Sequence, residues 1–475
     1  GTLPERVTSD SRAVGRGDAF AAWPGSRVDG RAFIPDAIAR GAGSVLWEAK
    51  DFRWNDAWSV PNAGVEGLAA RLGYIANMVY GNPSRDLWMV GVTGTNGKTT
   101  TSQWIAHALD GAGRRCGVIG TLGIGMVGAL TPAANTTPDA AVFHETLARF
   151  RDDGAKAVAM EVSSIGLDQG RVNGATFDIA VFTNLTRDHL DYHGTMAAYG
   201  DAKALLFSWP GLACSVINAD DPYGQRLIDE VRARGGRALT YGLANADVAA
   251  TGIAMGPRGY ALRVATPWGR GAVETGVVGE FNLSNLLATL GALLASDVEL
   301  DAALDALARL TPPPGRMERH GGDGRPLVVV DYAHTPDALE KVLAALRPAV
   351  VSGGELTCVF GCGGDRDPGK RPVMGRVAGE LADRVIVTSD NPRFEDPAAI
   401  AGAASKGVVE SGNRRWRIEL DRAAAIQAAV HAAKPGDVVL VAGKGHEAYQ
   451  EVKGERRPYT DARAVEDALA SWSGA

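Results

Sequence analysis

Cysteine is scarce in this chain, long apolar runs are absent, and neither sign of charge dominates. The 475 residues include four cysteines, Cys116, Cys214, Cys358 and Cys362, which are too few for a disulfide framework and indicate reduced thiols in a cytoplasmic protein. No stretch approaches the roughly 18 apolar residues of a membrane-spanning helix. The 49 basic and 55 acidic residues give a formal net charge of −6, which argues against a protein that binds nucleic acid through a basic face.

Glycine and proline are abundant, with 60 and 23 residues, and 45% of the chain is hydrophobic. This composition predicts folded domains with many short turns between strands and helices. Apolar runs that predict buried strands span Leu87–Val92, Val158–Val162, Ile179–Phe182, Leu327–Val330, Leu356–Phe360, Arg384–Thr388 and Val438–Val441. Alanine-rich amphipathic segments between them span Thr100–Asp110, Asp139–Asp152, Asp337–Leu346 and Arg422–Ala433. The alternation predicts an α/β fold with mostly parallel sheets covered by helices.

Two segments rich in proline and glycine predict the domain boundaries. Tyr80-Gly-Asn-Pro-Ser84 follows an amphipathic helix expected at about 65–79. Thr311-Pro-Pro-Pro-Gly315 predicts a stiff connector. We therefore expect three domains, at residues 1–85, 86–312 and 313–475, each of ordinary domain size.

The clearest local motif is Gly94-Thr-Asn-Gly-Lys-Thr-Thr100, which lies between an expected strand and an expected helix. Gly94 and Gly97 let backbone N–H groups turn toward a phosphate, and the helix N-terminus adds partial positive charge. Lys98 can reach the β- and γ-phosphates of a nucleotide, and the Thr99 hydroxyl can ligate Mg²⁺. The motif is a variant, because Val92 stands where the usual pattern has glycine. It predicts a nucleotide site without separating a motor, a switch, a kinase and a ligase.

Acidic and basic groups downstream add to this site. Glu161 closes an expected strand and could bind Mg²⁺ directly or through water. Residues 184–194 are rich in histidine and aspartate, which suits a metal or phosphate site. Lys203 enters an apolar helix, and taken alone it indicates a surface lysine whose stem lies along apolar neighbours.

In their order and spacing, these motifs resemble those of the Mur ligases, the ATP-dependent enzymes that build the peptide of the peptidoglycan precursor. The matching segments are Ser9–Arg12, Gly94–Thr100, Asn135–Pro138, Glu161–Ser164, Asp188–His193, Lys203, Asn282–Asn285, Pro314–Glu318, Asp331–His334, Gly361–Arg366, Asp390–Arg393 and Gly443–Glu447. Each segment alone is a weak signal. Together they cover nearly the whole chain and are very specific.

The resemblance implies a small N-terminal α/β UDP-binding domain, a central P-loop ATPase domain with a mostly parallel sheet, and a C-terminal Rossmann-like α/β domain that binds an amino acid. It implies an ATP-dependent amide ligase that joins meso-2,6-diaminopimelate to the D-glutamate of UDP-N-acetylmuramoyl-L-alanyl-D-glutamate through an acyl phosphate. The expected partners are these two small molecules, and neither nucleic acid nor a membrane. We expect a cytoplasmic monomer.

The resemblance also implies roles for single residues around ATP. The phosphates would meet Gly94, Thr95, Asn96, Gly97, Lys98, Thr99 and Thr100, and the adenosine would meet Asn282, Asn285, Arg316 and Asp331, with Asp331 on the ribose. Two Mg²⁺ ions would lie near Thr99, Glu161, His189 and Lys203, and the catalytic residues would be Lys98, Glu161, His189 and Lys203. Lys203 would carry a carbamate derived from CO₂, which converts a cation into an anion able to bind the second ion.

The UDP substrate would lie along the first two domains. The implied contacts are Ser9 and Ser11 near the uracil, Ser26, Arg27 and Val28 near the diphosphate, and Asn135, Thr136, Thr137, Ser163, Gln169 and Arg171 along the rest. Relatives differ at positions 26–28. Ile165 stands where the family often has a histidine, so any task of that histidine is absent here.

Asp390-Asn-Pro-Arg393 predicts which amino acid is added. It follows the strand expected at Arg384–Thr388, at the edge where open parallel sheets place ligands. A guanidinium binds the extra carboxylate of diaminopimelate bidentately, whereas it would repel the side-chain ammonium of lysine. The resemblance, which is to the diaminopimelate-adding branch, implies Arg366 for the other carboxylate and Glu447 for the ammonium. It also implies contacts from Asp390, Asn391, Pro392 and Gly443.

Four alternatives compete with this interpretation. A folylpolyglutamate synthetase shares the acyl-phosphate chemistry but usually lacks the N-terminal domain that carries Ser9-Asp-Ser-Arg12 here. A lysine-adding ligase lacks the arginine that corresponds to Arg393. A P-loop switch or motor would hydrolyse ATP without an acceptor amine and would leave the C-terminal motifs without a task. A pure binding module would not need Lys98, Thr99 and Glu161 together.

Overall fold

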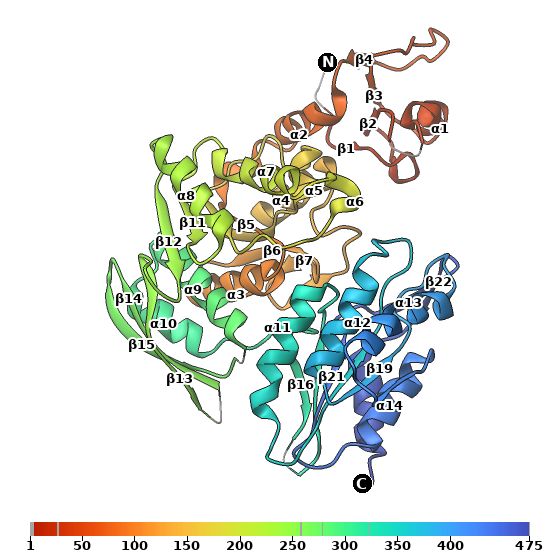
Figure 1. The fold of residues 1–475 in the computed structure, drawn as a ribbon. Coiled ribbons are helices and arrows are strands. Elements are labelled where there is room, and N and C mark those ends of the chain that lie inside the picture. The colour runs from red at the N-terminus through yellow and green to blue at the C-terminus, as the bar shows by residue number, and fades with distance from the viewer. Residues whose placement is uncertain (1–3, 26–27, 257–258, 278, 323, 475) are drawn as a thin grey trace.

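Three sheets, each from a different part of the sequence, organise the computed structural model, which describes residues 4–25, 28–256, 259–277, 279–322 and 324–474. The unit around the second sheet lies between the other two units (Figure 1). The α/β fold predicted from the alternation of strands and helices is confirmed. Within the described residues, no helix is both long enough and apolar enough to cross a membrane.

The N-terminal unit is a parallel sheet with the strand order β1-β2-β3-β4. Its elements are β1 (Val7–Thr8), β2 (Ala19–Ala22), α1 (Ile34–Ala39), β3 (Ser44–Glu48), β4 (Asn62–Val65) and α2 (Leu68–Val79). The helix expected at about 65–79 begins only at Leu68, because the preceding residues pair with β3 as an edge strand. Gly67, at a φ of 65°, turns the chain from that strand into the helix.

The central unit is an eleven-stranded sheet with the order β15-β14-β13-β12-β11-β10-β5-β9-β6-β7-β8. Its middle is parallel, and antiparallel strands extend both ends. The strands are β5 (Trp88–Thr93), β6 (Cys116–Gly120), β7 (Gly123–Met126), β8 (Ala129–Thr131), β9 (Ala157–Glu161), β10 (Ile179–Phe182), β11 (Cys214–Asn218), β12 (Ala238–Gly242), β13 (Val248–Gly256), β14 (Gly259–Thr266) and β15 (Gly269–Thr275). The helices are α3 (Lys98–Gly111), α4 (Ala140–Asp152), α5 (Ser164–Asp168), α6 (Leu190–His193), α7 (Met196–Ala204), α8 (Pro222–Ala233), α9 (Glu280–Ala295) and α10 (Leu300–Ala308).

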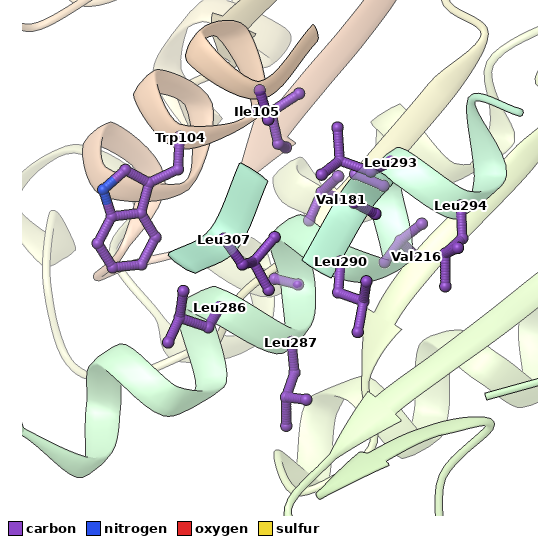
Figure 2. Close-up of a cluster of buried hydrophobic side chains, with 14 of the residues drawn as sticks. Trp104, Ile105, Val181, Val216, Leu286, Leu287, Leu290, Leu293, Leu294 and Leu307 are labelled. Atoms are coloured by element: carbon purple, nitrogen blue, oxygen red, sulfur yellow. The ribbon is translucent and has the colours of Figure 1, made fainter. Parts of the chain in front are cut away.

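Hydrophobic side chains cover both faces of this sheet. Figure 2 shows one cluster, in which Trp104 and Ile105 of α3 pack with leucines of α9 and α10 against Val181 and Val216 of the sheet. The neighbours Met89 and Val90 on β5 belong to different clusters, because successive side chains of a strand point to opposite faces. With both faces covered, the strand ends are left to carry the functional loops.

The C-terminal unit is a sheet with the order β16-β17-β21-β18-β19-β20, in which only β16 is antiparallel to its neighbour. Its elements are β16 (Glu318–Gly321), β17 (Leu327–Asp331), α11 (Pro336–Leu346), β18 (Leu356–Phe360), α12 (Lys370–Leu381), β19 (Arg384–Val387), α13 (Pro397–Glu410), β20 (Trp416–Ile418), α14 (Arg422–His431), β21 (Val438–Ala442) and α15 (Asp461–Ala470). A separate hairpin is formed by β22 (Tyr449–Val452) and β23 (Glu455–Pro458).

The connector at residues 311–315 is held at both ends. The indole N–H of Trp104 donates to the carbonyl of Thr311 over 2.8 Å. Gly315 has a φ of 65°, and a side chain there would collide with the backbone of Gly445 and His446. The connector therefore fixes where the chain enters the C-terminal unit.

Candidate active site

The phosphate loop joins β5 to α3, as the sequence predicts. Gly94 and Gly97 have φ values of 148° and 84°, which suit glycine and strain other residues. A side chain at Gly94 would collide with Thr183, and one at Gly97 would collide with Asn285. The loop is therefore closely enclosed by the end of β10 and by α9.

A buried lysine and a partly buried lysine meet at one carbonyl of this loop. The Nζ of Lys98 donates to the carbonyls of Gly94 and Thr95 over 2.8 and 2.9 Å, and the Nζ of Lys203 donates to the same Gly94 carbonyl over 2.8 Å. Lys203 is 1% exposed, and its Nζ lies 4.2 Å from the centre of the Tyr199 ring. The interpretation of Lys203, taken alone, as a surface lysine is therefore wrong. Lys203 also lies in the last turn of α7 and does not enter a helix, since α7 already begins at Met196.

Desolvation lowers the pKa of both lysines. It lowers the pKa of Lys203 well below the usual value, and the charge of Lys98 lowers it further, while Asp188 opposes the change. Burial also lowers the pKa of Lys98, against the opposing charges of Glu161 and Asp188. Near neutral pH, a larger fraction of Lys203 is therefore neutral amine than for an exposed lysine.

Glu161 stands at the end of β9 with its carboxylate bound on both oxygens. It accepts hydrogen bonds from the Thr99 hydroxyl over 3.0 Å and from the backbone N–H and hydroxyl of Thr121 over 2.7 and 3.1 Å. Thr121 reaches this place because β6, which precedes it, pairs with β9. Carboxylate and hydroxyl oxygens are the ligands that Mg²⁺ prefers. The donor set of Thr99 and Glu161 therefore fits a magnesium ion beside a phosphate.

His189 lies at the edge of this group. Its backbone is left-handed, at a φ of 52°, its side chain is 45% exposed, and its Nε2 lies 3.6 Å from Asp188 Oδ2. Partial desolvation of the ring lowers the pKa of His189, Asp188 opposes this, and Lys98 and Lys203 add to it. Among the described residues, no three side chains of His, Cys, Asp or Glu form a group that could hold a metal. The expectation of a metal or phosphate site at residues 184–194 therefore stays a prediction.

The C-terminal unit reaches the phosphate loop directly. The Asn96 amide donates to Asp337 Oδ2 of α11 over 2.9 Å, and Arg316 Nη2 donates to the Thr99 hydroxyl over 3.1 Å. The Arg316 guanidinium lies 4.5 Å from the centre of the Tyr332 ring, which also contacts His446. Arg316 Nε and His446 Nδ1 are buried and have no hydrogen-bond partner in the described part of the chain. Such atoms are costly unless a ligand satisfies them, so this boundary fits a polar ligand such as a nucleotide.

The other residues expected at the adenosine lie on both sides of the same boundary. On α9, Asn285 donates to Asn282 over 3.1 Å and accepts from the Thr101 hydroxyl over 3.4 Å. Asp331, at the end of β17, accepts the backbone N–H groups of Met317 and Ala333, each over 2.8 Å. Burial raises the pKa of Asp331, against the charge of Arg316. Asp331 thus binds the backbone at the start of the C-terminal sheet, next to Arg316.

Arg393 is held by the hairpin. Its N–H donates to the Glu451 carbonyl over 3.0 Å, and its own carbonyl accepts the Lys453 N–H over 2.6 Å. Its backbone is left-handed, at a φ of 50°. Its Nη1 donates to the Gly364 carbonyl over 2.6 Å, and both Arg393 and Arg366 approach Gly363. The two arginines expected to bind carboxylates therefore flank one loop.

An open cavity of about 410 Å³ lies between the central and C-terminal units. It is lined by Arg187, Leu190, Asp191, Asp365, Arg366, Asp367 and Pro368. Arg187 and Asp367 form an ion pair of 3.7 Å between the two units. Arg366 is thus placed at a cavity to which both units contribute.

Asp390, Asn391 and Pro392 are buried, and two residues after β21 lie against them. Asn391 donates to Glu447 Oε2 over 2.7 Å. A Cβ atom at Gly443 would lie 2.7 Å from Asp390 Oδ2. The structure therefore brings together the segments that follow β19 and β21, as the sequence predicts for one ligand site.

The residues expected along the UDP substrate form a connected strip. The Thr137 hydroxyl donates to Ser163 Oγ over 3.0 Å, and Arg171 donates to the Thr137 carbonyl over 2.8 Å and to Gln169 Oε1 over 2.7 Å. Thr136 lies beside this strip with its hydroxyl 3.0 Å from that of Thr121. Asn135 is exposed next to it. The strip thus runs from the Glu161 site toward the surface.

The residues expected near the uracil and the diphosphate lie in the N-terminal unit. Ser9 and Ser11 are partly buried after β1, and Val28 is exposed. Ser26 and Arg27 lie outside the described residues. Ile165, where the family often has a histidine, is partly buried on α5.

Each of the three units matches a part of one family. Residues 5–80 match the Mur ligase family catalytic domain, residues 92–293 match the Mur ligase middle domain, and residues 315–445 match the Mur ligase glutamate ligase domain. A protein of Chromobacterium violaceum named UDP-N-acetylmuramoyl-L-alanyl-D-glutamate--2,6-diaminopimelate ligase is 53% identical over 98% of this chain and 94% of its own length. The chain belongs to the Mur ligase family. The resemblance stated from the sequence is confirmed.

Other Mur ligases are also similar to this chain over nearly its whole length. A Pseudomonas aeruginosa protein with the same name is 52% identical over 99% of this chain and 96% of its own length. The solved structure of a UDP-N-acetylmuramoyl-L-alanyl-D-glutamate--2,6-diaminopimelate ligase is 39% identical, with a TM-score of 0.71, and covers 98% of this chain and 95% of its own. A MurF ligase from Thermotoga maritima in complex with ADP shares the fold at 20% identity, with a TM-score of 0.68, over 98% of this chain and 97% of its own.

Some residues of this Mur ligase site escaped the sequence analysis. Thr121 binds Glu161, Tyr199 lies under Lys203, Arg187 lines the cavity, and Lys444 contacts Asn391. Arg187 lies within residues 184–194 and Lys444 within Gly443–Glu447, so these two motifs were the available signal. Thr121 and Tyr199 are ordinary residues in the sequence, and only the fold brings them to the site.

Proposed function

We propose that this Mur ligase uses ATP to join meso-diaminopimelate to the D-glutamate of UDP-N-acetylmuramoyl-L-alanyl-D-glutamate. The observation that carries the proposal is that relatives about half identical to it, over nearly their full length, bear this activity in their names. Arg393 and Arg366, which come from different loops and both approach Gly363, support the same choice of amino acid, because the substrate carries two carboxylates and a guanidinium binds each bidentately.

The reaction activates a carboxylate and then forms an amide. The γ-phosphoryl group of ATP passes to an oxygen of the D-glutamate carboxylate, which forms an acyl phosphate and releases ADP. The amine then attacks the acyl carbon, phosphate leaves, and the amine nitrogen loses a proton. All groups that react in the first step are anionic, so preorganised positive charge is the main requirement. Lys98 and the N-terminus of α3 supply that charge at the loop.

The boundary between the units supplies a second requirement, which is to keep water from the acyl phosphate. Asn96 with Asp337 and Thr99 with Arg316 join the phosphate loop to the C-terminal unit. Substrates bound at this boundary would lie between the activated carboxylate and the amino-acid site. Water that is excluded there cannot hydrolyse the intermediate before the amine attacks.

We propose that Thr99 and Glu161 hold Mg²⁺, with His189 and a carbamylated Lys203 near a second ion. When bound, Mg²⁺ would offset the negative charge of the phosphates. The proposal for Lys203 is supported by its burial and by the lowered pKa of its amine, because only a neutral amine adds to CO₂. That addition forms an N–C bond and releases one proton.

The residues that contact the substrates are likewise proposed. For the amino acid we propose Arg366, Asp390, Asn391, Pro392, Arg393, Gly443 and Glu447. For the nucleotide we propose Gly94 to Thr100, Asn282, Asn285, Arg316 and Asp331, and for the UDP substrate Ser9, Ser11, Ser26, Arg27, Val28, Asn135, Thr136, Thr137, Ser163, Gln169 and Arg171. We also propose domains at 1–85, 86–312 and 313–475, and a monomer that works in the cytoplasm, where ATP is present.

The test is the mass of the product made from UDP-N-acetylmuramoyl-dipeptide, ATP and either diaminopimelate or lysine. We expect a product heavier by one diaminopimelate residue and little product with lysine. Release of ADP with each substrate omitted in turn is the control. Preference for lysine would contradict the assignment of the amino acid, and full ADP release without an amine would favour a P-loop switch or motor.

A further inference from the structure

Lys444 is a buried charge with a specific set of partners. It follows β21 and is 0% exposed. Its Nζ lies 3.0 Å from Asn391 Oδ1 and 2.8 Å from Glu447 Oε2, and 5.7 Å from the centre of the Tyr449 ring. A buried ammonium is costly unless acceptors surround it. Both of its acceptors belong to the proposed amino-acid site.

Lys444 determines which way the Asn391 amide faces. Asn391 Oδ1 accepts from Lys444 Nζ and also from the backbone N–H of Glu451 over 2.9 Å. A flipped amide would turn its NH₂ group toward these two donors, which is unfavourable. The Asn391 nitrogen is therefore directed at Glu447 Oε2, 2.7 Å away.

The same contacts leave one part of the Glu447 carboxylate for a ligand. Oε2 accepts from both Lys444 and Asn391, whereas no hydrogen bond from a described residue reaches Oε1. The side chain is 19% exposed, so it is not sealed from the surface as Lys444 is. An ammonium group of a ligand could bind there through a charge-assisted hydrogen bond.

Lys444 also balances the charge of the proposed amino-acid site. Asp390 and Glu447 bring two carboxylates, and Arg393 and Lys444 bring two cations. The four formal charges sum to zero, which suits the zwitterionic end of an amino acid, with one ammonium and one carboxylate. Without Lys444, the Glu447 carboxylate would lose the cation paired with it.

We infer that Lys444 is a positioning residue that orients Asn391 and Glu447 to receive the ammonium of the amino-acid substrate. This inference rests on the proposed function, because the substrate is the one proposed there. Lys444 itself is buried behind these two side chains and acts through them.

The test compares the KM values of Lys444→Met with those of the wild type. Lys444→Met keeps the length of the side chain and removes the charge. We expect the KM for diaminopimelate to rise by about tenfold or more, as for a lost hydrogen bond to a charged group. The KM values for ATP and the UDP substrate should stay within about twofold, since that lies within the ordinary scatter of variants with no lost contact. Lys444→Arg, which keeps the charge, should restore part of the loss.

Lys434→Met is the matched control. Lys434 is exposed and precedes β21, whereas Lys444 follows the same strand, so the two lysines lie at opposite ends of it. We expect all three KM values of this variant to equal those of the wild type. Thermal unfolding of each variant reports whether it folds.

Each outcome decides a separate question. If the wild type forms no diaminopimelate product, the proposed function fails and this inference fails with it. If the wild type is active and the KM for diaminopimelate is unchanged in Lys444→Met, or all three KM values rise together, only the positioning role is overturned. If Lys444→Met does not fold, the same criterion applies to Lys444→Gln, which also removes the charge but keeps a polar end. If neither variant folds, the lysine serves the fold and the positioning role is also overturned.

Discussion

Single lysines in this protein differ in chemistry because they differ in surroundings. Lys203 is buried beside Lys98 and a tyrosine ring, and both lysines donate to the Gly94 carbonyl. Burial and the nearby like charge both favour the neutral amine. A neutral amine can be carbamylated, whereas an ammonium cannot.

Lys203→Ala should lower turnover by more than about a hundredfold, the scale of losing one charged catalytic group, without preventing folding. The reason is that alanine cannot supply the anion that a carbamate would place beside the phosphate loop. Turnover is measured as ADP release, and folding is checked by circular dichroism. Short carboxylates added to the variant should restore part of the activity. Turnover equal to that of the wild type would remove the proposed role of the carbamate.

The lowered pKa of Lys203 gives a pH dependence with a definite sign. Above that pKa the amine is neutral and can add CO₂, and below it the ammonium cannot, so the carbamate should be lost as the pH falls. We expect a carbamate signal in the ¹³C NMR spectrum of protein in ¹³C-bicarbonate at neutral pH, where an exposed lysine would remain protonated. Lys203→Ala, the control, should lack this signal. A wild-type protein with no signal at any pH would contradict the prediction.

Arg393→Ala should raise the KM for diaminopimelate by about ten- to a hundredfold, the scale of a lost bidentate charged contact. The KM for ATP should not change, because Arg393 contacts the loop of Gly363 and Gly364, and does not contact the phosphate loop. Steady-state kinetics with each substrate varied separately measure both values. An unaltered KM for diaminopimelate would show that Arg393 does not bind this substrate.

At the scale of elements, one buried ion pair links two helices to two strand ends. Arg422 of α14 binds both oxygens of Asp461 at the start of α15, each over 2.7 Å. The same guanidinium donates to the carbonyls of Ser389 and Ala442, which directly precede Asp390 and Gly443. The helices thereby fix the strand ends that carry the proposed amino-acid site.

Asp461→Asn should destabilise the C-terminal unit by about 3–5 kcal/mol, because it leaves a buried guanidinium without its counter-charge. Asp467→Asn is the control, since Asp467 pairs with Arg463 on the same helix and both side chains are exposed. That change should cost less than about 0.5 kcal/mol. Urea unfolding of the full chain compares the two variants. Equal shifts of the unfolding midpoint would show that the buried ion pair contributes no more to stability than the exposed one.

At the scale of the whole molecule, the site is divided between units. The phosphate loop lies in the central unit, and the proposed amino-acid site lies in the C-terminal unit. Three contacts connect the two units: Asn96–Asp337, Thr99–Arg316 and Arg187–Asp367. One chain therefore carries all the groups of the proposed site. Substrates that bridge the units should draw them together.

Small-angle X-ray scattering should show a smaller radius of gyration when an ATP analogue and the UDP substrate are bound. The physical reason is that polyanionic ligands gather cationic and amide groups from both sides of the boundary. Diaminopimelate alone is the control, because its proposed contacts lie in the C-terminal unit. The same compactness with and without all substrates would count against closure by a hinge.

The fold was largely predictable because its signals are local. The seven strands expected from apolar runs are all present, each within one residue of its expected ends. Buried parallel strands are continuous apolar runs, and they stand out against the polar loops and amphipathic helices. The helix expected at about 65–79 was wrong at its start, because the pairing of β4 with β3 is a long-range contact.

By itself, the amino-acid sequence determined the fold class, the phosphate loop and membership of the Mur ligase family, since each depends on residues close together in the chain or on the order of motifs. Only the tertiary structure decided that Lys203 is buried at Gly94, that Thr121 binds Glu161 and that Lys444 lies between Asn391 and Glu447. Except for Lys444 and Glu447, which are three residues apart, these partners are separated in the sequence, and the tertiary fold brings them together. Burial then changes the charge that a side chain can carry, which no local pattern records.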